Sequence, residues 1–121
     1  IGRKGTIDRP QYVNTPFWTI DTLFYTEINV RYVTKFIYYK FLLIPWVQYN
    51  EASGVPSLNA ATIEAIEINL PDYNEQSAIA TVLSDMDTEI EALEKRLEKT
   101  RMLKQGMMQE LLSGKTRIIE N

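Results

Sequence analysis

At 121 residues, with thirteen basic and sixteen acidic side chains, the chain can form one modest domain with an appended element, and its formal net charge of -3 gives no overall attraction to nucleic acid. It contains no histidine and no cysteine, which excludes zinc sites built from these residues, disulfides, thiol nucleophiles and histidine bases. The longest apolar run, residues 36–47, is broken by Lys40 and Pro45 and is too short to span a bilayer.

The chain opens with a basic loop. Arg3, Lys4 and Arg9 form the densest cluster of positive charge in its first half, around Gly5, which allows close approach of a backbone. Residues 1–60 hold six basic and four acidic side chains, against seven and twelve in residues 61–121. A contact with a polyanion is therefore expected in the first half. The alternative is a solvated turn with ordinary surface charge.

Short segments rich in Thr, Tyr, Phe, Val and Ile follow this loop, and their composition predicts strands. Pro10, the turn at residues 14–16 and Asp21 separate them, and the predicted strands cover residues 11–14, 17–20 and 22–30. A later alternating segment, residues 66–70, predicts a final strand. The aromatic residues could stack on bases, but their strand and helix spacing favours a core for Phe17, Trp18, Phe24, Tyr25, Tyr39 and Trp46.

Residues 32–49 predict a helix packed on the sheet, because apolar residues recur there at steps of three or four. Pro45 should kink or end this helix early. Lys35 and Lys40 in this helix, with Arg31 directly before it, could line a phosphate track or simply form the solvated face. A loop at residues 53–57 follows, and Asn59 is expected to cap a short helical turn over residues 60–64.

A long helix is predicted for residues 74–113. Asp72 and Glu75 form a plausible capping box, with Asn74 as a rival cap, and Ser113-Gly114 should end the helix. The apolar side chains alternate steps of four and three, which is the repeat of a coiled-coil seam. This seam is formed by Ile79, Leu83, Met86, Ile90, Leu93 and Leu97, is interrupted by Thr100 and Lys104, and continues with Met107 and Leu111.

Such a helix, about 60 Å long at 1.5 Å per residue, needs another helix to pack against. Gly106 stands inside it, where glycine costs about 1 kcal/mol relative to alanine, and this favours close approach of a second backbone. A tolerated glycine is the alternative. From periodicity alone, a plain dimerisation coil is as good an interpretation as any more specific one.

The second half resembles the C-terminal part of the specificity subunits of type I restriction-modification enzymes. The similarity is carried by Leu70-Pro71, Glu75-Gln76, Ile79-Ala80, residues 83–87 with Ile90, residues 103–109 and residues 111–117. Two upstream stretches, residues 3–7 and 54–59, look like recurrent loops of the target recognition domain of that family. The opening inside a loop without an initiator methionine suggests a fragment that lacks the front half of this domain.

The resemblance implies a non-catalytic, cytoplasmic, bacterial subunit that binds double-stranded DNA. It implies modification subunits as partners, which methylate adenine with S-adenosylmethionine, and a restriction subunit that joins them. No cofactor is expected in this chain, and no membrane contact. The long helix would be the second conserved helix of such a subunit, paired antiparallel with a conserved helix of the same subunit or of a second copy.

The resemblance also assigns the DNA-contacting residues. Arg3 and Lys4 are expected on phosphates, Thr6 or Arg9 nearer a base, with Gly5, Ser57 and Asn59 completing the contact. For Ser57 and Asn59 the alternative is local turn and cap chemistry, which already accounts for Asn59. Asp8 departs from the family pattern, which often has glycine there. Its carboxylate either accepts a hydrogen bond from a cytosine amine or lies off the DNA.

The predicted fold class is α+β. Residues 1–70 form the C-terminal part of a recognition domain, a small sheet with a packed helix, and residues 71–121 form the long coiled-coil helix with a short tail. No metal site is predicted, because Asp85, Asp87 and Glu89 have no further ligand and fit solvent or a basic methyltransferase surface. No set of nucleophile, base and oxyanion donors is present either. The competing hypothesis is a coiled-coil assembly module that does not read DNA.

Overall fold

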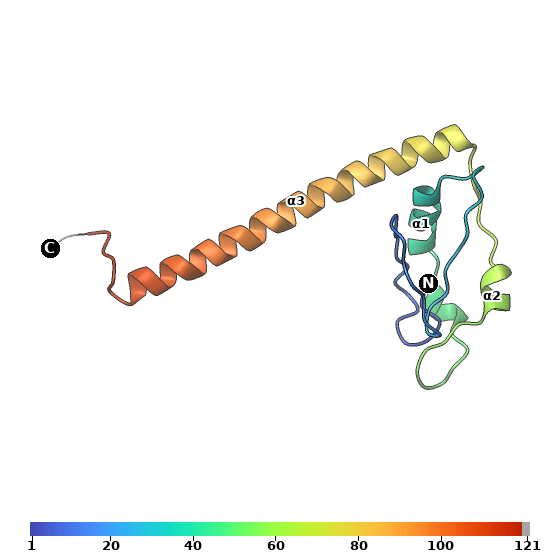
Figure 1. The fold of residues 1–121 in the computed structure, drawn as a ribbon, viewed down its shortest axis with the longest axis horizontal. Helices are drawn as coiled ribbons and strands as arrows, with labels where there is room; N and C mark the ends of the chain where they lie inside the picture. The colour runs from blue at the N-terminus through green and yellow to red at the C-terminus, as the bar shows by residue number, and fades with distance from the viewer. Residues whose placement is uncertain (120–121) are drawn as a thin grey trace. The chain divides into compact units, whose positions relative to one another are not determined.

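A computed structural model describes residues 1–119, which contain three α-helices and one short 3₁₀-helix. In chain order these are α1 (Thr34–Leu42), η1 (Trp46–Tyr49), α2 (Ala60–Glu64) and α3 (Tyr73–Leu112) (Figure 1). The chain divides into two compact units, the first covering Ile1–Thr81 and the second beginning at Val82. The first turns of α3 therefore belong to the first unit.

The predicted small sheet is wrong. Across residues 1–119 the segments predicted as strands form no ladder, and β-pairing is limited to two isolated bridges, Gly2 with Leu23 and Lys4 with Ser57. Residues 66–70 have no regular secondary structure, and residues 11–20 are all exposed. Aromatic and β-branched residues favour strands when a neighbouring strand and a buried face are present. Residues 11–14 and 17–20 have neither, and residues 22–30 pair only with the few extended residues at the start of the chain, so their composition alone does not make a sheet.

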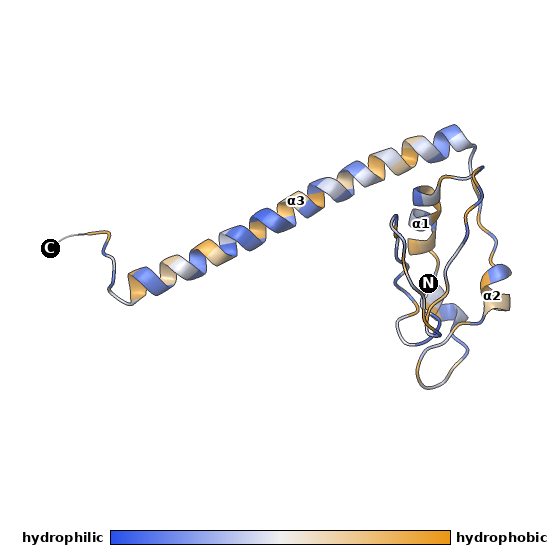
Figure 2. Ribbon diagram, viewed as in Figure 1, coloured by the Kyte–Doolittle hydropathy of each residue, from blue (hydrophilic) through white to orange (hydrophobic). Residues whose placement is uncertain are grey.

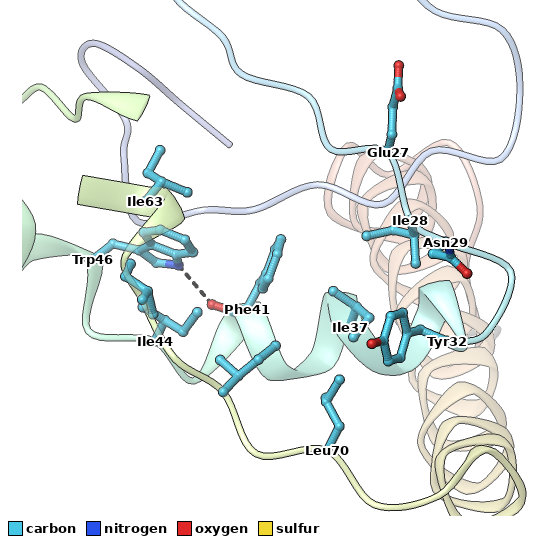
Figure 3. A pocket seen from close by; sticks show the side chains of 12 residues that line it. Glu27, Ile28, Asn29, Tyr32, Ile37, Phe41, Ile44, Trp46, Ile63 and Leu70 are labelled. Atoms are coloured by element: carbon cyan, nitrogen blue, oxygen red, sulfur yellow. Dashed lines mark hydrogen bonds between the residues drawn. The ribbon is translucent and has the colours of Figure 1, made fainter. Parts of the chain in front are cut away.

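The predicted burial of the aromatic residues is correct for Trp46 and wrong for Trp18. Trp46 is 2% exposed, and its indole N–H donates to the Phe41 carbonyl over 2.8 Å, the dashed line in Figure 3. Trp18 is 96% exposed. Phe17 and Tyr25 are also exposed and meet edge to face, with their ring centroids 6.3 Å apart. The strand spacing that predicted their burial lost its meaning because no sheet forms there.

The predicted helix over residues 32–49 ends before Pro45, as expected. Helix α1 ends at Leu42, and the 3₁₀-helix η1 begins after the proline, which cannot donate a backbone N–H. The N-cap residue of α1, Val33, has no side chain that can cap the helix. Instead Gln76 in the first turn of α3 is 2% exposed, and its Oε1 accepts from the Val33 N–H at 3.0 Å. Its Nε2 donates to the Pro71 carbonyl at 2.8 Å. One buried amide thus fastens the start of α3 to the start of α1.

The core of the first unit consists of two small clusters. Ile7, Trp46 and Leu58 form one, and Phe36, Ile37 and Ala80 form the other, with Phe41 packed against both. A cavity of about 350 Å³ lies beside them, lined mostly by isoleucine, leucine and aromatic side chains (Figure 3). This cavity is partly open to the surface of the first unit.

The predicted helix ends are confirmed. Asn59 Oδ1 accepts from the Thr62 N–H at 2.8 Å and caps α2. Asp72 Oδ1 accepts from the Glu75 N–H at 2.9 Å at the start of α3. Helix α3 ends at Leu112, and Gly114 follows with φ +78°, a conformation that favours glycine. These signals are local, so the sequence alone was enough to place them. None of the described helices is both long enough and apolar enough to cross a membrane.

Candidate nucleic-acid interface

Two loops that are far apart in the sequence meet in the first unit. We call residues 2–9 the basic loop and residues 50–59 the second loop. The Gly5 N–H donates to the Pro56 carbonyl and the Leu58 N–H donates to the Arg3 carbonyl, both over 2.8 Å. Between these bonds, Lys4 and Ser57 form an antiparallel bridge. The structure thus joins the two stretches singled out in the sequence into one continuous edge.

Two glycines shape the basic loop, each for a different reason. Gly5 has φ +82°, with nothing within 4 Å of the position of a Cβ atom. Gly2 is buried, and a Cβ there would lie 1.9 Å from the Thr6 carbonyl oxygen. On the side away from the second loop, the Arg3 N–H donates to the Thr22 carbonyl at 2.7 Å. Hydrogen bonds therefore hold the backbone of this loop on both sides. At Gly2 the backbone passes close to the carbonyl group of Thr6.

The cationic side chains of the basic loop differ in how they are held. Arg3 lies over the Phe24 ring, with its Cζ atom 5.6 Å from the ring centroid, and reaches the Asp21 carbonyl at 3.4 Å. Lys4 and Arg9 are exposed. Solvent-facing cations of this kind are what contact with phosphate requires. The acidic side chain of Asp8 is exposed in the same loop.

The predicted contacts of the second loop, Ser57 and Asn59, are placed differently. Asn59 is committed at both ends of its amide, since Oδ1 caps α2 and Nδ2 donates to the Glu51 carboxylate. The same carboxylate accepts from the Thr62 hydroxyl. Ser57 is half-buried beside Lys4, and its carbonyl accepts from the Glu51 N–H at 3.0 Å. Ser57 therefore belongs to the joined edge, whereas Asn59 acts as a helix cap.

Asn50, which no sequence-based prediction included, closes the second loop. Its Oδ1 accepts from the backbone N–H groups of Ala52 at 3.0 Å and Ser57 at 2.9 Å, and its Nδ2 donates to the Ala52 carbonyl at 3.0 Å. An asparagine that bonds to a backbone N–H two residues on is a recognised turn former. An asparagine at residue 50 could therefore have predicted a turn over residues 50–52. No nearby residue indicates the bond to Ser57, which is seven positions away.

The possible phosphate track along α1 is not a row of free cations. The Lys35 ammonium lies 4.2 Å from the Tyr12 ring centroid, and 5.4 and 5.6 Å from those of Tyr38 and Tyr39. Arg31 Nε donates to Asn29 Oδ1 at 3.4 Å. Lys35 therefore binds the aromatic rings and ties the segment around Tyr12 to α1. Among residues 1–119 no three acidic side chains gather into a group that could hold a metal ion.

The predicted seam of α3 begins in the first unit and continues through the second. Ile79 packs against the cluster of Phe36, Ile37 and Ala80. Farther along, the apolar residues recur between polar ones (Figure 2), and about half of each side chain is exposed: Met86 56%, Ile90 51%, Leu93 56%, Leu97 49% and Met107 52%. Leu83 and Leu111 are half-buried. At Gly106 a Cβ atom would meet nothing within 4 Å.

Residues 1–100 match the family described as the type I restriction modification DNA specificity domain. The chain is similar to the type I restriction enzyme MjaVIII specificity subunit of Methanocaldococcus jannaschii, 36% identical over 63 residues, which are 52% of this chain and 15% of that protein. It is also similar to the putative type I restriction enzyme MjaX specificity subunit of the same organism, 37% identical over 57 residues, which are 47% of this chain and 13% of that protein.

The chain thus matches only a small part of each relative's length. Both relatives are archaeal, so they do not support the expected bacterial source. No solved structure matches the chain at a significant level.

Proposed function

This chain belongs to the type I restriction modification DNA specificity family, and we propose that it contributes to reading the DNA sequence for such a system. The observation that carries the proposal is the family match over residues 1–100, which includes the basic loop, the second loop and most of α3. The joining of the two loops at Lys4 and Ser57 supports it, because it puts exposed positive charge beside small polar groups on one edge.

In this proposal the joined edge lies against double-stranded DNA. Lys4 and Arg3 contact phosphates, where each cation releases condensed counterions and makes binding strongly salt-dependent. Thr6, Arg9 and Ser57 lie nearer the bases, because hydroxyl and guanidinium groups can bond to base edges. Gly5 has no side chain that would keep the backbone of the basic loop away from the DNA. Asn59 acts through the second loop it helps to hold, since both ends of its amide are engaged.

We propose that the seam of α3 pairs with a second helix and forms a coiled coil. The charges along α3 support an antiparallel partner. Residues 85–98 carry six acidic and two basic side chains, and the rest of α3, residues 99–112, carries three basic and one acidic. A partner helix with the same polarity, running the other way, would place each acidic part opposite a basic part. A conserved helix of the same subunit or the α3 of a second copy could fill this role.

The remaining parts of the proposal concern the larger enzyme. The chain would be non-catalytic and would help to dock modification subunits, which would carry S-adenosylmethionine and methylate adenine. A restriction subunit would join that assembly. The acidic residues around Asp85 could face a basic surface on the modification subunit.

A methylation map tests the proposal. The native subunit that contains this chain is co-expressed with the modification subunit of the same system in a host free of adenine methylation. Methylated adenines are then located by single-molecule sequencing. We expect methylation confined to one sequence motif. An assembled complex that methylates no motif would contradict the role in DNA reading.

The second candidate function is assembly without DNA reading, and the half-exposed apolar seam of α3 favours it. The two candidates differ in the effect of the basic loop. A pure assembly module should pair through α3 equally well with and without DNA, and reversing the charge of Lys4 should change nothing. A specificity role predicts a loss of DNA binding from that same reversal.

A further inference from the structure

Asn50 closes the second loop with three hydrogen bonds. Its Oδ1 accepts from the N–H groups of Ala52 and Ser57, which stand at opposite ends of the loop, and its Nδ2 returns a bond to the Ala52 carbonyl. Asn50 is half-buried, so these bonds are partly shielded from competing water. One side chain therefore sets the distance between the two ends of the loop.

The tip of the second loop depends on this closure. Residues 53–56 are all exposed, and Val55 in the tip is 68% exposed. Neither Ser53 nor Gly54 takes part in a helix, and the tip carries no charge. The Asn50 side chain and the Glu51 N–H hold Ser57, where the tip rejoins the core.

The closure extends to the basic loop. The residue that Asn50 holds, Ser57, is the bridge partner of Lys4, and the carbonyl of the preceding Pro56 accepts from the Gly5 N–H at 2.8 Å. A displacement of Ser57 would therefore move the backbone of Gly5 and with it the origin of the Lys4 side chain. Asn50 acts on the joined edge through two short links.

We propose that Asn50 is a positioning residue for DNA reading, one that sets sequence discrimination by fixing the second loop against the basic loop. The proposal rests on the proposed function. Contacts to phosphate tolerate small movements because a long flexible cation can follow its target. Base edges are read only by groups held within about 0.5 Å of the right place. Loss of the Asn50 bonds should therefore reduce specificity more than general affinity.

The test uses the native subunit assembled with its modification subunits and two duplexes. One duplex carries, without methyl groups, the motif that the methylation map identifies. The other duplex carries the same bases in scrambled order. The ratio of the two dissociation constants measures discrimination. In Asn50→Leu, which keeps the branched shape and the number of side-chain heavy atoms but removes every bond, we expect this ratio to fall about tenfold, the worth of one well-placed base contact. Binding to the scrambled duplex and its salt dependence should stay within about twofold of the unaltered complex.

Three further variants complete the design. Asn50→Asp keeps both acceptor bonds and should restore most of the ratio, because a uniform charge effect cancels in it. Asn69→Leu, an exposed asparagine in the segment before α3, is the matched control and should leave the ratio unchanged. If Asn50→Leu does not assemble, Asn50→Ser replaces it, since a serine side chain is too short to span both N–H groups. The same tenfold loss is expected.

An unchanged ratio in an assembled Asn50 variant would overturn the inference and leave the proposed function intact. An equal loss on both duplexes, together with a lower melting temperature, would also overturn it, because that pattern indicates only a structural role. Absence of any discrimination by the unaltered complex would overturn the proposed function itself.

Discussion

Replacing Gly2 with alanine should damage the basic loop more than the same change at any other glycine of the first unit. A Cβ at Gly2 would lie 1.9 Å from the Thr6 oxygen, 2.9 Å from the Thr6 carbonyl carbon and 3.3 Å from the Ile7 Cα. Carbon and oxygen atoms that are not bonded need about 3.2 Å or more. The backbone at Gly2 or at Thr6 must therefore move by more than about 1 Å.

The energetic cost follows from what that movement breaks. Gly2 bridges Leu23, and the next residue, Arg3, donates to the Thr22 carbonyl and accepts from the Leu58 N–H. Overpacking of a buried position typically costs about 1–3 kcal/mol, and the loss of one or two backbone bonds adds about 1 kcal/mol each. We expect a total of about 3 kcal/mol for Gly2→Ala.

Two other glycines provide matched controls in the same unit. Gly5→Ala meets no atom within 4 Å but must keep φ +82°, so we expect a loss of about 1–2 kcal/mol from the left-handed conformation alone. Gly54 has open space and no such φ. Gly54→Ala should therefore be neutral, or stabilise slightly by reducing the freedom of the unfolded chain.

The assay is thermal unfolding followed by the near-ultraviolet circular dichroism of the buried Trp46, with DNA binding measured in parallel. For a unit of this size, 1 kcal/mol corresponds to a shift of about 4–8 °C. From highest to lowest, the expected order of melting temperatures is Gly54→Ala, then Gly5→Ala, then Gly2→Ala. If Gly2→Ala and Gly54→Ala melted at the same temperature, the close approach of Gly2 to the Thr6 carbonyl would not exist in solution. The predicted overpacking would then be refuted.

Three other predictions follow from the same structure. Lys4→Glu should weaken binding to specific and scrambled duplexes alike and reduce the salt slope by about one; a loss confined to the specific duplex would refute a phosphate contact. Leu93→Glu should abolish helix pairing by α3, as measured by analytical ultracentrifugation of the assembled subunit, whereas Met102→Glu, which lies off the seam, should not. Gln76→Leu leaves the Val33 N–H without its acceptor and should lower stability by about 1–3 kcal/mol in thermal unfolding; an unchanged melting temperature would show that water replaces the amide.

The parts of the structure that sequence predicted well are those fixed by near neighbours. Asn59, Asp72 and Gly114 mark helix ends because a cap or a left-handed residue acts within four positions of itself. Pro45 ended α1 for an equally local reason. The resemblance, too, was carried by continuous stretches of sequence, and the family match confirmed it.

The predictions that failed, and the features that were missed, concern residues whose positions depend on partners far away in the sequence. The segment containing Trp18 has the composition of a strand, but no neighbouring strand is present among residues 1–119, so it forms no ladder and the indole lies in solvent. The joined edge required Lys4 to find Ser57, and nothing near either residue indicated this. Asn50 was missed because its decisive bond crosses the loop to Ser57. Sequence patterns drew attention to the two loops, but they did not predict that the loops meet at Lys4 and Ser57.

The bridge between Lys4 and Ser57 also bears on the order of folding. Its two residues stand 53 positions apart, with α1 and η1 between them. Contacts of such long range form late, since the entropy of closing a long loop must be overcome before they stabilise anything. The edge proposed to read DNA is therefore absent until the intervening helices are in place. A nascent or damaged chain would carry the same positive charges without their arrangement, and competence to discriminate among sequences would arise only with completion of the fold.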